Sequence, residues 1–209
     1  MKKPEIRALI LAAGESSRTS TPKMLLPFGS MTLIERVIEK PLSSDISGVT
    51  VILGAWQDEL MSAIRHLNVS LVINEDFKKG MLSSVIRGIK SLPAGTDAAF
   101  IIPGDHPFIP GSLLDGMAEA YKQSGKGIII PVVGGKRGHP LLADVKYFGE
   151  IEKLDANVGL RALADKFSRD VYEYPAEDKM ILFDIDTLED YDRAIKKYNN
   201  YGKENQLYP

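Results

Sequence analysis

The chain has 209 residues, with 26 Lys and Arg against 28 Asp and Glu, so its net charge is −2. This length fits one domain, and 44% hydrophobic with 26% charged residues is ordinary for a globular protein. The sequence has no cysteine, which excludes disulfides, zinc–thiolate sites and thiol catalysis. Three histidines argue against a His-rich metal site, and the balanced charge gives no reason to expect a nucleic-acid partner.

No membrane segment is evident in the sequence. No stretch reaches the roughly 18 consecutive apolar residues that a membrane span requires. The first residues, Met1-Lys2-Lys3-Pro4-Glu5, run into a short apolar segment without a signal-peptide cleavage site. We therefore expect a cytoplasmic protein without a membrane partner.

Strand-like and helix-like segments alternate along the chain. Thr32 followed by Glu35 is typical of a capping box at a helix start. Apolar runs predict strands at 8–11, 49–53, 69–73, 98–102, 128–133 and 141–143, with an edge strand at 171–174. Helices are predicted over 33–41, 56–67, 81–89, 110–124, 145–151, 159–167 and from 188 to about 198. This order predicts one α/β domain, 1–198, with a Rossmann-like, mostly parallel sheet, helices on both of its faces and a polar tail, 199–209.

The first strand leads into a loop that suits a polyphosphate. Ala12, Ala13 and Gly14 are small, so a bulky ligand can approach the backbone there. Arg18 and Lys23 follow, and their side chains offer a fork of donors and a compact positive charge. The alternative is an ordinary loop between a strand and a helix, with two solvated cations.

Two later segments carry polar groups beside predicted strand ends. Gly80 and Met81 open a helix whose serines, Ser83 and Ser84, either serve as common capping residues or bind a base and ribose. Asp105 lies directly beyond the fourth strand, at the edge where open α/β sheets bind ligands. It either stabilises a turn or, beside a phosphate loop, binds Mg²⁺.

Two stretches in the second half of the chain can also be interpreted in functional or in purely structural terms. Lys136, Arg137 and His139 occupy a Gly-rich loop that we expect to be mobile and to suit an anionic acceptor. Asp184 and Asp186 alternate on what we predict to be a strand end, so both can point to one side. Thr187 with Asp190 matches a variant of the capping box, which by itself accounts for this last stretch.

The chain resembles the MobA-like nucleotidyltransferases in five motifs that occur in the family's order. Its first loop matches the pattern L-A-A-G-x-S-x-R-M-G-x-x-K-x-L-L-P of the molybdenum cofactor cytidylyltransferase branch, except that Thr19-Ser20 replaces Met-Gly. The other motifs are N-x-x-Y-x-x-G-M-x-S-S, with Phe77 for Tyr, then G-D-x-P, G-x-x-G-H-P and D-I-D-T-P-E-D-Y, with Leu188 for Pro. The resemblance covers about residues 6 to 191.

The resemblance implies a nucleotide-diphospho-sugar transferase type of fold and a role for each matching residue. Mg²⁺ is the implied cofactor, held by Asp105 and Asp186, with Asp186 favoured over Asp184. Arg18 and Lys23 are the implied catalytic cations, and Arg137, Gly138 and His139 the implied acceptor contacts. The implied nucleotide-binding residues are Leu11, Ala12, Ala13, Gly14, Arg18, Lys23, Gly80, Met81 and Ser84.

The implied reaction transfers a nucleotidyl group, most simply CMP from CTP, to molybdopterin with release of pyrophosphate. Ala13 follows the cytidylyltransferase form, because the guanylyltransferases of the family carry Gly-Gly at that point. A molybdoenzyme or its chaperone is a further implied partner. Two alternatives stay open: a sugar- or polyol-phosphate nucleotidyltransferase of the same superfamily, and a non-catalytic nucleotide-binding or chaperone-like protein.

Overall fold

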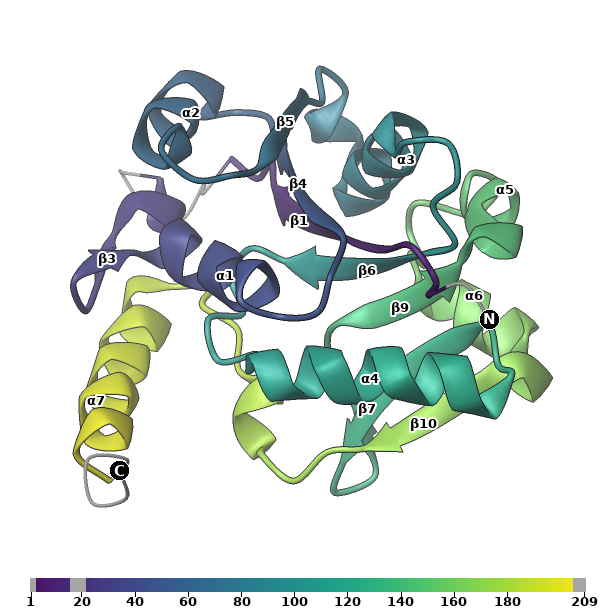
Figure 1. Ribbon diagram of the computed structural model, residues 1–209. Helices are drawn as coiled ribbons and strands as arrows, with labels where there is room; N and C mark the ends of the chain where they lie inside the picture. The colour runs from purple at the N-terminus through teal and green to yellow at the C-terminus, as the bar shows by residue number, and fades with distance from the viewer. Residues whose placement is uncertain (1–2, 16–21, 205–209) are drawn as a thin grey trace.

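One central sheet organises the molecule (Figure 1). The structure is a computed structural model that describes residues 3–15 and 22–204, with side chains as far as residue 200. Within these residues, eight strands form the sheet in the order β10-β7-β9-β6-β1-β4-β5, and β8 pairs with β7. They are β1 (Ile6–Ala12), β4 (Gly48–Leu53), β5 (Ser70–Ile73), β6 (Ala98–Pro103), β7 (Ile128–Val133), β8 (Lys136–Arg137), β9 (Leu141–Asp144) and β10 (Val171–Pro175).

Most of the strands run in the same direction, which confirms the predicted mostly parallel sheet. β1 pairs in parallel with both β4 and β6, β4 with β5, and β7 with β10. β9 is antiparallel to β6 and to β7, so β7 also runs in the direction of β6. The carboxyl ends of six strands therefore meet at one edge of the sheet, where ligands bind in such folds.

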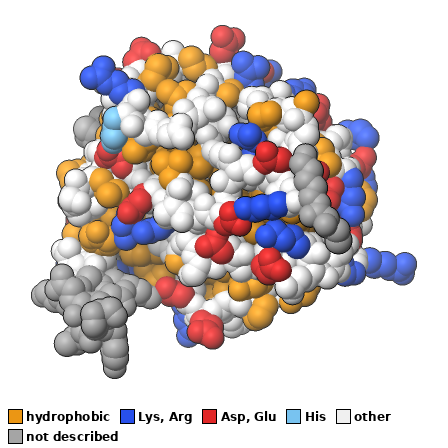
Figure 2. All heavy atoms as spheres, in the orientation of Figure 1, with side chains coloured by type: hydrophobic (Ala, Val, Ile, Leu, Met, Phe, Trp, Pro, Cys, Tyr) orange, Lys and Arg blue, Asp and Glu red, His pale blue; other side chains and the backbone are white. Residues whose placement is uncertain are grey.

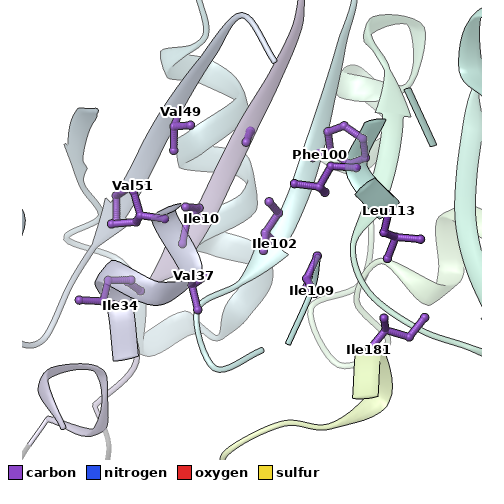
Figure 3. Close-up of a cluster of buried hydrophobic side chains, with 14 of the residues drawn as sticks. Ile10, Ile34, Val37, Val49, Val51, Phe100, Ile102, Ile109, Leu113 and Ile181 are labelled. Atoms are coloured by element: carbon purple, nitrogen blue, oxygen red, sulfur yellow. The ribbon is translucent and has the colours of Figure 1, made fainter. Parts of the chain in front are cut away.

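Helices cover both faces of the sheet, as predicted. Along β1, Ile10 belongs to a buried cluster with α1 (Leu33–Leu42), α2 (Gln57–Ile64) and α4 (Gly111–Ser124). Leu9 and Leu11 point to the opposite face and pack with α3 (Met81–Ser91), α5 (Phe148–Ile151) and α6 (Arg161–Lys166). Figure 3 shows the first cluster, in which Ile10, Val51 and Ile102 from three neighbouring strands face Ile34 and Val37 of α1. Alternating side chains thus bury the central strands on both sides.

A small hairpin and the last helix pack together beside the main sheet. The hairpin consists of β2 (Pro27–Phe28) and β3 (Met31–Thr32), and the helix is α7 (Leu188–Glu204). The ring of Tyr198 on α7 lies 4.9 Å from that of Phe28, and the Tyr191 hydroxyl donates to the carbonyl of Pro27. Thr187 accepts from the Asp190 amide at 3.1 Å, which confirms the predicted cap of α7.

Three details differ from the sequence-based expectations. Residues 136–137 form the short strand β8 inside the stretch that we expected to be a loop throughout. The stretch 183–187 is not a strand end; it lies between the 3-10 helix Lys179–Leu182 and α7. Helix α7 continues to Glu204, six residues beyond its predicted end, so the expected tail is shorter.

The surface in Figure 2 carries Lys and Arg interspersed with Asp and Glu side chains. None of the helices in the described residues is both long and apolar enough to cross a bilayer.

The capping box of α1 yields a stability prediction. The Thr32 hydroxyl accepts from the Glu35 amide at 3.4 Å, and the Glu35 carboxylate accepts from the Thr32 amide at 2.6 Å. Replacing Thr32 with Ala should lower the free energy of unfolding by about 1 kcal/mol, because one helix-end amide loses its partner. Thr32→Ser keeps the hydroxyl and should stay close to wild type. Urea unfolding curves of the three proteins measure this, and equal stability of Thr32→Ala and wild type would contradict it.

Candidate functional site

A cavity of about 510 Å³ opens at the carboxyl edge of the sheet. Its volume falls within the range of small-molecule sites. The loops after β1, β5, β6 and β8 supply most of its lining. Nine of the residues predicted for the site line it: Leu11, Ala13, Gly14, Lys23, Gly80, Met81, Ser84, Asp105 and His139. Residues far apart in the sequence thus converge on one space.

One end of the cavity gathers a cation and oxygen atoms of three residues. Lys23 begins the 3-10 helix Lys23–Leu25, and its Nζ donates to Asp105 Oδ2 at 2.9 Å and to the Ile185 carbonyl at 2.7 Å. The same Nζ lies 3.5 Å from Asp186 Oδ1. The Ile185 amide donates to the Asp105 carbonyl at 3.1 Å, which ties the segment before α7 to the end of β6. Two carboxylates and a carbonyl therefore surround one positive charge.

Asp105 is held by two partners on opposite oxygens. Its Oδ1 lies 2.9 Å from His106 Nδ1, while Oδ2 faces Lys23. Burial raises the pKa of Asp105, but the hydrogen bond from His106 and the charge of Lys23 outweigh it and hold the pKa well below its usual value. Asp105 is therefore ionised at neutral pH and presents a negative charge to the cavity.

The chemistry of this donor set fits a magnesium ion. Mg²⁺ prefers oxygen ligands and is bound in proteins by one or two carboxylates together with phosphate and water. Asp105, Asp186 and the Ile185 carbonyl are such ligands, and they already surround the ammonium of Lys23. Among the described residues, no three His, Asp or Glu side chains lie close enough to hold a metal on their own. The residues thus suit a cation that arrives with a phosphate-bearing ligand.

The other end of the cavity is formed by tightly packed backbone and by the start of α3. A Cβ on Gly54 would lie 2.5 Å from the Ala13 carbonyl and 2.9 Å from Phe77 Cβ, so only glycine lets these loops meet. Gly80 has φ +95° and leads into Met81, whose side chain is 52% exposed. Ser84 is buried and accepts from Asn74 Nδ2 at 3.0 Å. This end offers backbone groups, an exposed apolar side chain and a hydroxyl.

The three residues predicted to contact the acceptor, Arg137, Gly138 and His139, have different surroundings in the structure. Arg137 on β8 does not line the cavity, and its guanidinium lies 3.0 Å from Glu173 and 3.5 Å from Asp165. Gly138 packs beside Ile181 and Leu182 and is not part of the lining. His139 does line the cavity, with its ring 4.8 Å from that of His106. Burial and the neighbouring His106 lower the pKa of His139 to about 4, so it is neutral at pH 7.

The remaining predicted residues have different positions. Arg18 lies outside the described residues. Ala12 is buried in the core cluster and does not line the cavity. Ala13 contributes to the lining, but it is only 5% exposed and belongs to the cluster packed under α3. Of the two late aspartates, Asp184 lines the cavity and Asp186 reaches Lys23.

Several residues that line the cavity were not predicted as site residues from the sequence. Met24, Lys78 and His106 line the cavity and were not singled out. His106 directly follows Asp105, so its proximity could have been used as a signal. Met24 and Lys78 lie in stretches whose local pattern is that of ordinary loops, and only the fold brings them to the cavity.

Comparisons with known proteins agree with this geometry. Residues 8–171 match the model of the MobA-like NTP transferase domain. The molybdenum cofactor cytidylyltransferase of Escherichia coli is 28% identical over 195 residues, which are 92% of this chain and 97% of that protein. A probable molybdenum cofactor guanylyltransferase of Natranaerobius thermophilus is also 28% identical, over 91% of this chain and 95% of that one. The crystal structure of Rv0371c from Mycobacterium tuberculosis has a TM-score of 0.84 at 23% identity, over 94% of this chain and all of that one. The chain therefore belongs to the MobA-like NTP transferase domain family, and it is a nucleotidyltransferase.

Proposed function

We propose that this nucleotidyltransferase transfers CMP from CTP to molybdopterin, with Mg²⁺ as its cofactor. An acceptor phosphate oxygen bonds to the α-phosphorus of CTP, and the bond from that phosphorus to the bridging oxygen breaks. Pyrophosphate leaves with the electron pair. The observation that carries the proposal is the contact of Lys23 with Asp105 and Asp186 beside a cavity that Gly80, Met81 and Ser84 also line.

The polar end of the cavity suits the triphosphate. Asp105 and Asp186, with the Ile185 carbonyl, are the residues that would hold Mg²⁺, which supplies charge neutralisation and a fixed arrangement of phosphate oxygens when bound. Lys23 would turn its ammonium from the carboxylates to the β- and γ-phosphates, and Arg18 is proposed to assist it. Such catalysis consists mainly of positioning and of stabilising the charge that develops on phosphoryl oxygens.

The opposite end suits a nucleoside. Leu11, Ala13 and Gly14 line the cavity, and so do Gly80 and Met81. The exposed side chain of Met81 offers an apolar surface on which a base can lie. Ala12, which is buried behind this loop, would support it without contacting the nucleotide. We place the base here because the triphosphate needs the cationic end.

The acceptor is proposed to contact His139 rather than Arg137. His139 lines the cavity next to His106, whereas Arg137 is engaged by Glu173 and Asp165. A neutral imidazole can donate or accept a hydrogen bond but adds no positive charge. This favours recognition of a polar, hydroxylated or ring-nitrogen group of molybdopterin at His139. Gly138 would serve the acceptor side only by setting the path of the chain before His139.

The neutral imidazole of His139 can also form hydrogen bonds with sugar or polyol hydroxyl groups, so a nucleotidyltransferase acting on a sugar or polyol phosphate is a second candidate. A chaperone-like protein that only binds nucleotide is a weaker candidate, because binding alone does not need the two aspartates beside Lys23. A molybdoenzyme or its chaperone would receive the product under the first proposal.

The choice of base gives a direct test of the proposal. The Ala13 methyl packs into the core. We therefore expect the selection of the nucleotide base to depend on hydrogen bonds at Ser84 and at the Gly80–Met81 backbone. A mismatched buried hydrogen bond costs about 1–3 kcal/mol, or roughly ten- to a hundredfold. CTP should therefore bind at least about tenfold tighter than GTP in competition titrations with CTP, GTP, ATP and UTP in Mg²⁺. Tighter binding of GTP would overturn the cytidylyl assignment.

A further inference from the structure

Asn74 lies behind the nucleoside end of the cavity and connects to two serines at the start of α3. It is 3% exposed and does not itself line the cavity. Its Nδ2 donates to Ser83 Oγ at 2.9 Å and to Ser84 Oγ at 3.0 Å. Its Oδ1 accepts from the Asp76 amide at 3.1 Å. Every polar atom of this buried side chain therefore has a partner, and one of those partners belongs to the cavity wall.

The orientation of the Asn74 amide follows from its partners. The Asp76 amide can only donate, so the Asn74 atom facing it must be the carbonyl oxygen. The amide nitrogen then faces both serines with its two N–H groups. Each serine hydroxyl must accept from Asn74, and its own hydrogen must go elsewhere.

The hydroxyl hydrogens of Ser83 and Ser84 differ in the acceptors within their reach. Ser83 Oγ lies 2.7 Å from the Gly80 carbonyl and 3.0 Å from that of Asp76, so its hydrogen stays within the loop. Ser84 Oγ has no acceptor for its hydrogen among residues 3–15 and 22–200, and this buried side chain lines the cavity. Its hydrogen is thus available to a ligand.

We propose that Asn74 is a positioning residue that fixes the Ser84 hydroxyl as a hydrogen-bond donor, and that this donor selects cytosine over uracil. The inference rests on the proposed function, because it takes the base to lie at this end of the cavity. Cytosine N3 is an acceptor and receives the Ser84 hydrogen. Uracil carries a hydrogen on N3, so the hydroxyl would have to accept, and its own hydrogen would be left buried without a partner. Loss of such a partner is worth roughly ten- to a hundredfold in affinity.

Asn74→Asp is the test. It keeps the shape of the side chain at position 74 but replaces the N–H donor that faces Ser84 with an acceptor. A carboxylate still accepts from the Asp76 amide and now also accepts from both serines, which keeps it ionised. Ser84 then donates to the new carboxylate and can only accept from the base. Any general repulsion of the triphosphate by the new charge affects CTP and UTP equally and cancels in their ratio. Ser84→Ala removes the donor altogether, and Ser83→Ala is the matched control outside the cavity wall.

The measurement is the ratio of UTP to CTP dissociation constants from competition titrations with Mg²⁺. We expect wild type and Ser83→Ala to favour CTP by at least about tenfold, Ser84→Ala to approach a ratio of one, and Asn74→Asp to fall below one. An unchanged ratio in Asn74→Asp or Ser84→Ala overturns the inference, as does a wild type without preference for CTP over UTP. If the ratio inverts while no CMP is transferred to molybdopterin, the inference stands and the proposed transfer fails.

Discussion

Replacing Asp105 with Asn should lower the rate of nucleotidyl transfer by about 10²–10³, the usual cost of losing one preorganised charged contact. The amide keeps the size of the carboxylate and can still accept from His106, but it removes the charge that faces Lys23 and the proposed Mg²⁺. Asp186→Asn should have a smaller but still large effect, and Asp184→Asn a smaller one again. Asp184 lines the cavity, whereas Asp105 and Asp186 are the carboxylates that face the Lys23 ammonium.

Initial rates of pyrophosphate release over a range of Mg²⁺ concentrations measure the losses in the three aspartate variants and so rank them. Thermal unfolding of each variant separates lost chemistry from lost structure. Wild-type turnover by Asp105→Asn would contradict the metal assignment. A larger loss in Asp184→Asn than in Asp186→Asn would exchange the roles of those two residues.

Replacing Lys23 with Met should change metal binding and nucleotide binding in opposite directions. The ammonium now lies between the proposed metal ligands, at 2.9 Å from Asp105 and 3.5 Å from Asp186, so it competes with a free cation. Its removal should tighten Mn²⁺ binding in the absence of nucleotide by about tenfold, because the carboxylates lose a competing positive charge. The same change removes a charged contact to the triphosphate, worth about 1.5–3 kcal/mol, and should weaken CTP binding by roughly ten- to a hundredfold. CMP, which lacks the outer phosphates, should be affected less.

Electron paramagnetic resonance titrations with Mn²⁺ and calorimetry with CTP and CMP measure the two effects. Lys122→Met is the matched control, because Lys122 pairs with Glu119 on α4 and does not line the cavity. Weaker Mn²⁺ binding in Lys23→Met would show that the ammonium does not compete with the metal. Equal losses for CTP and CMP would show that Lys23 does not face the outer phosphates.

Local sequence patterns predicted the elements that depend on local chemistry. The apolar runs of β1, β4, β6 and β7 identify buried strands, and Thr32 with Glu35 identifies the start of α1. The antiparallel direction of β9 has no such signal, because a short apolar strand reads alike in either direction. Its pairing joins Ala98 to Asp144, and only the complete sheet decides it.

The same limit applies to the site. A loop with Gly14 and Lys23, and an aspartate after a strand, can be recognised from local pattern and from family motifs. The ion pairs of Arg137 could not be predicted from its own stretch, because its partners, Asp165 and Glu173, come from α6 and β10. His106 and His139 approach each other from loops that follow different strands, and their contact helps to set the charge of His139. Such pairings depend on the fold and leave no mark in the local sequence.

If this cavity joins CMP to molybdopterin, as we propose, the identity of the product will show it. Purified protein, Mg²⁺, molybdopterin and equal concentrations of CTP and GTP can be incubated together and the products identified by mass spectrometry. We expect a molybdopterin whose mass has increased by one CMP unit, formed with one pyrophosphate per product and at least about a hundredfold more slowly with Asp105→Asn. A GMP adduct, or unmodified molybdopterin beside intact CTP, would contradict it.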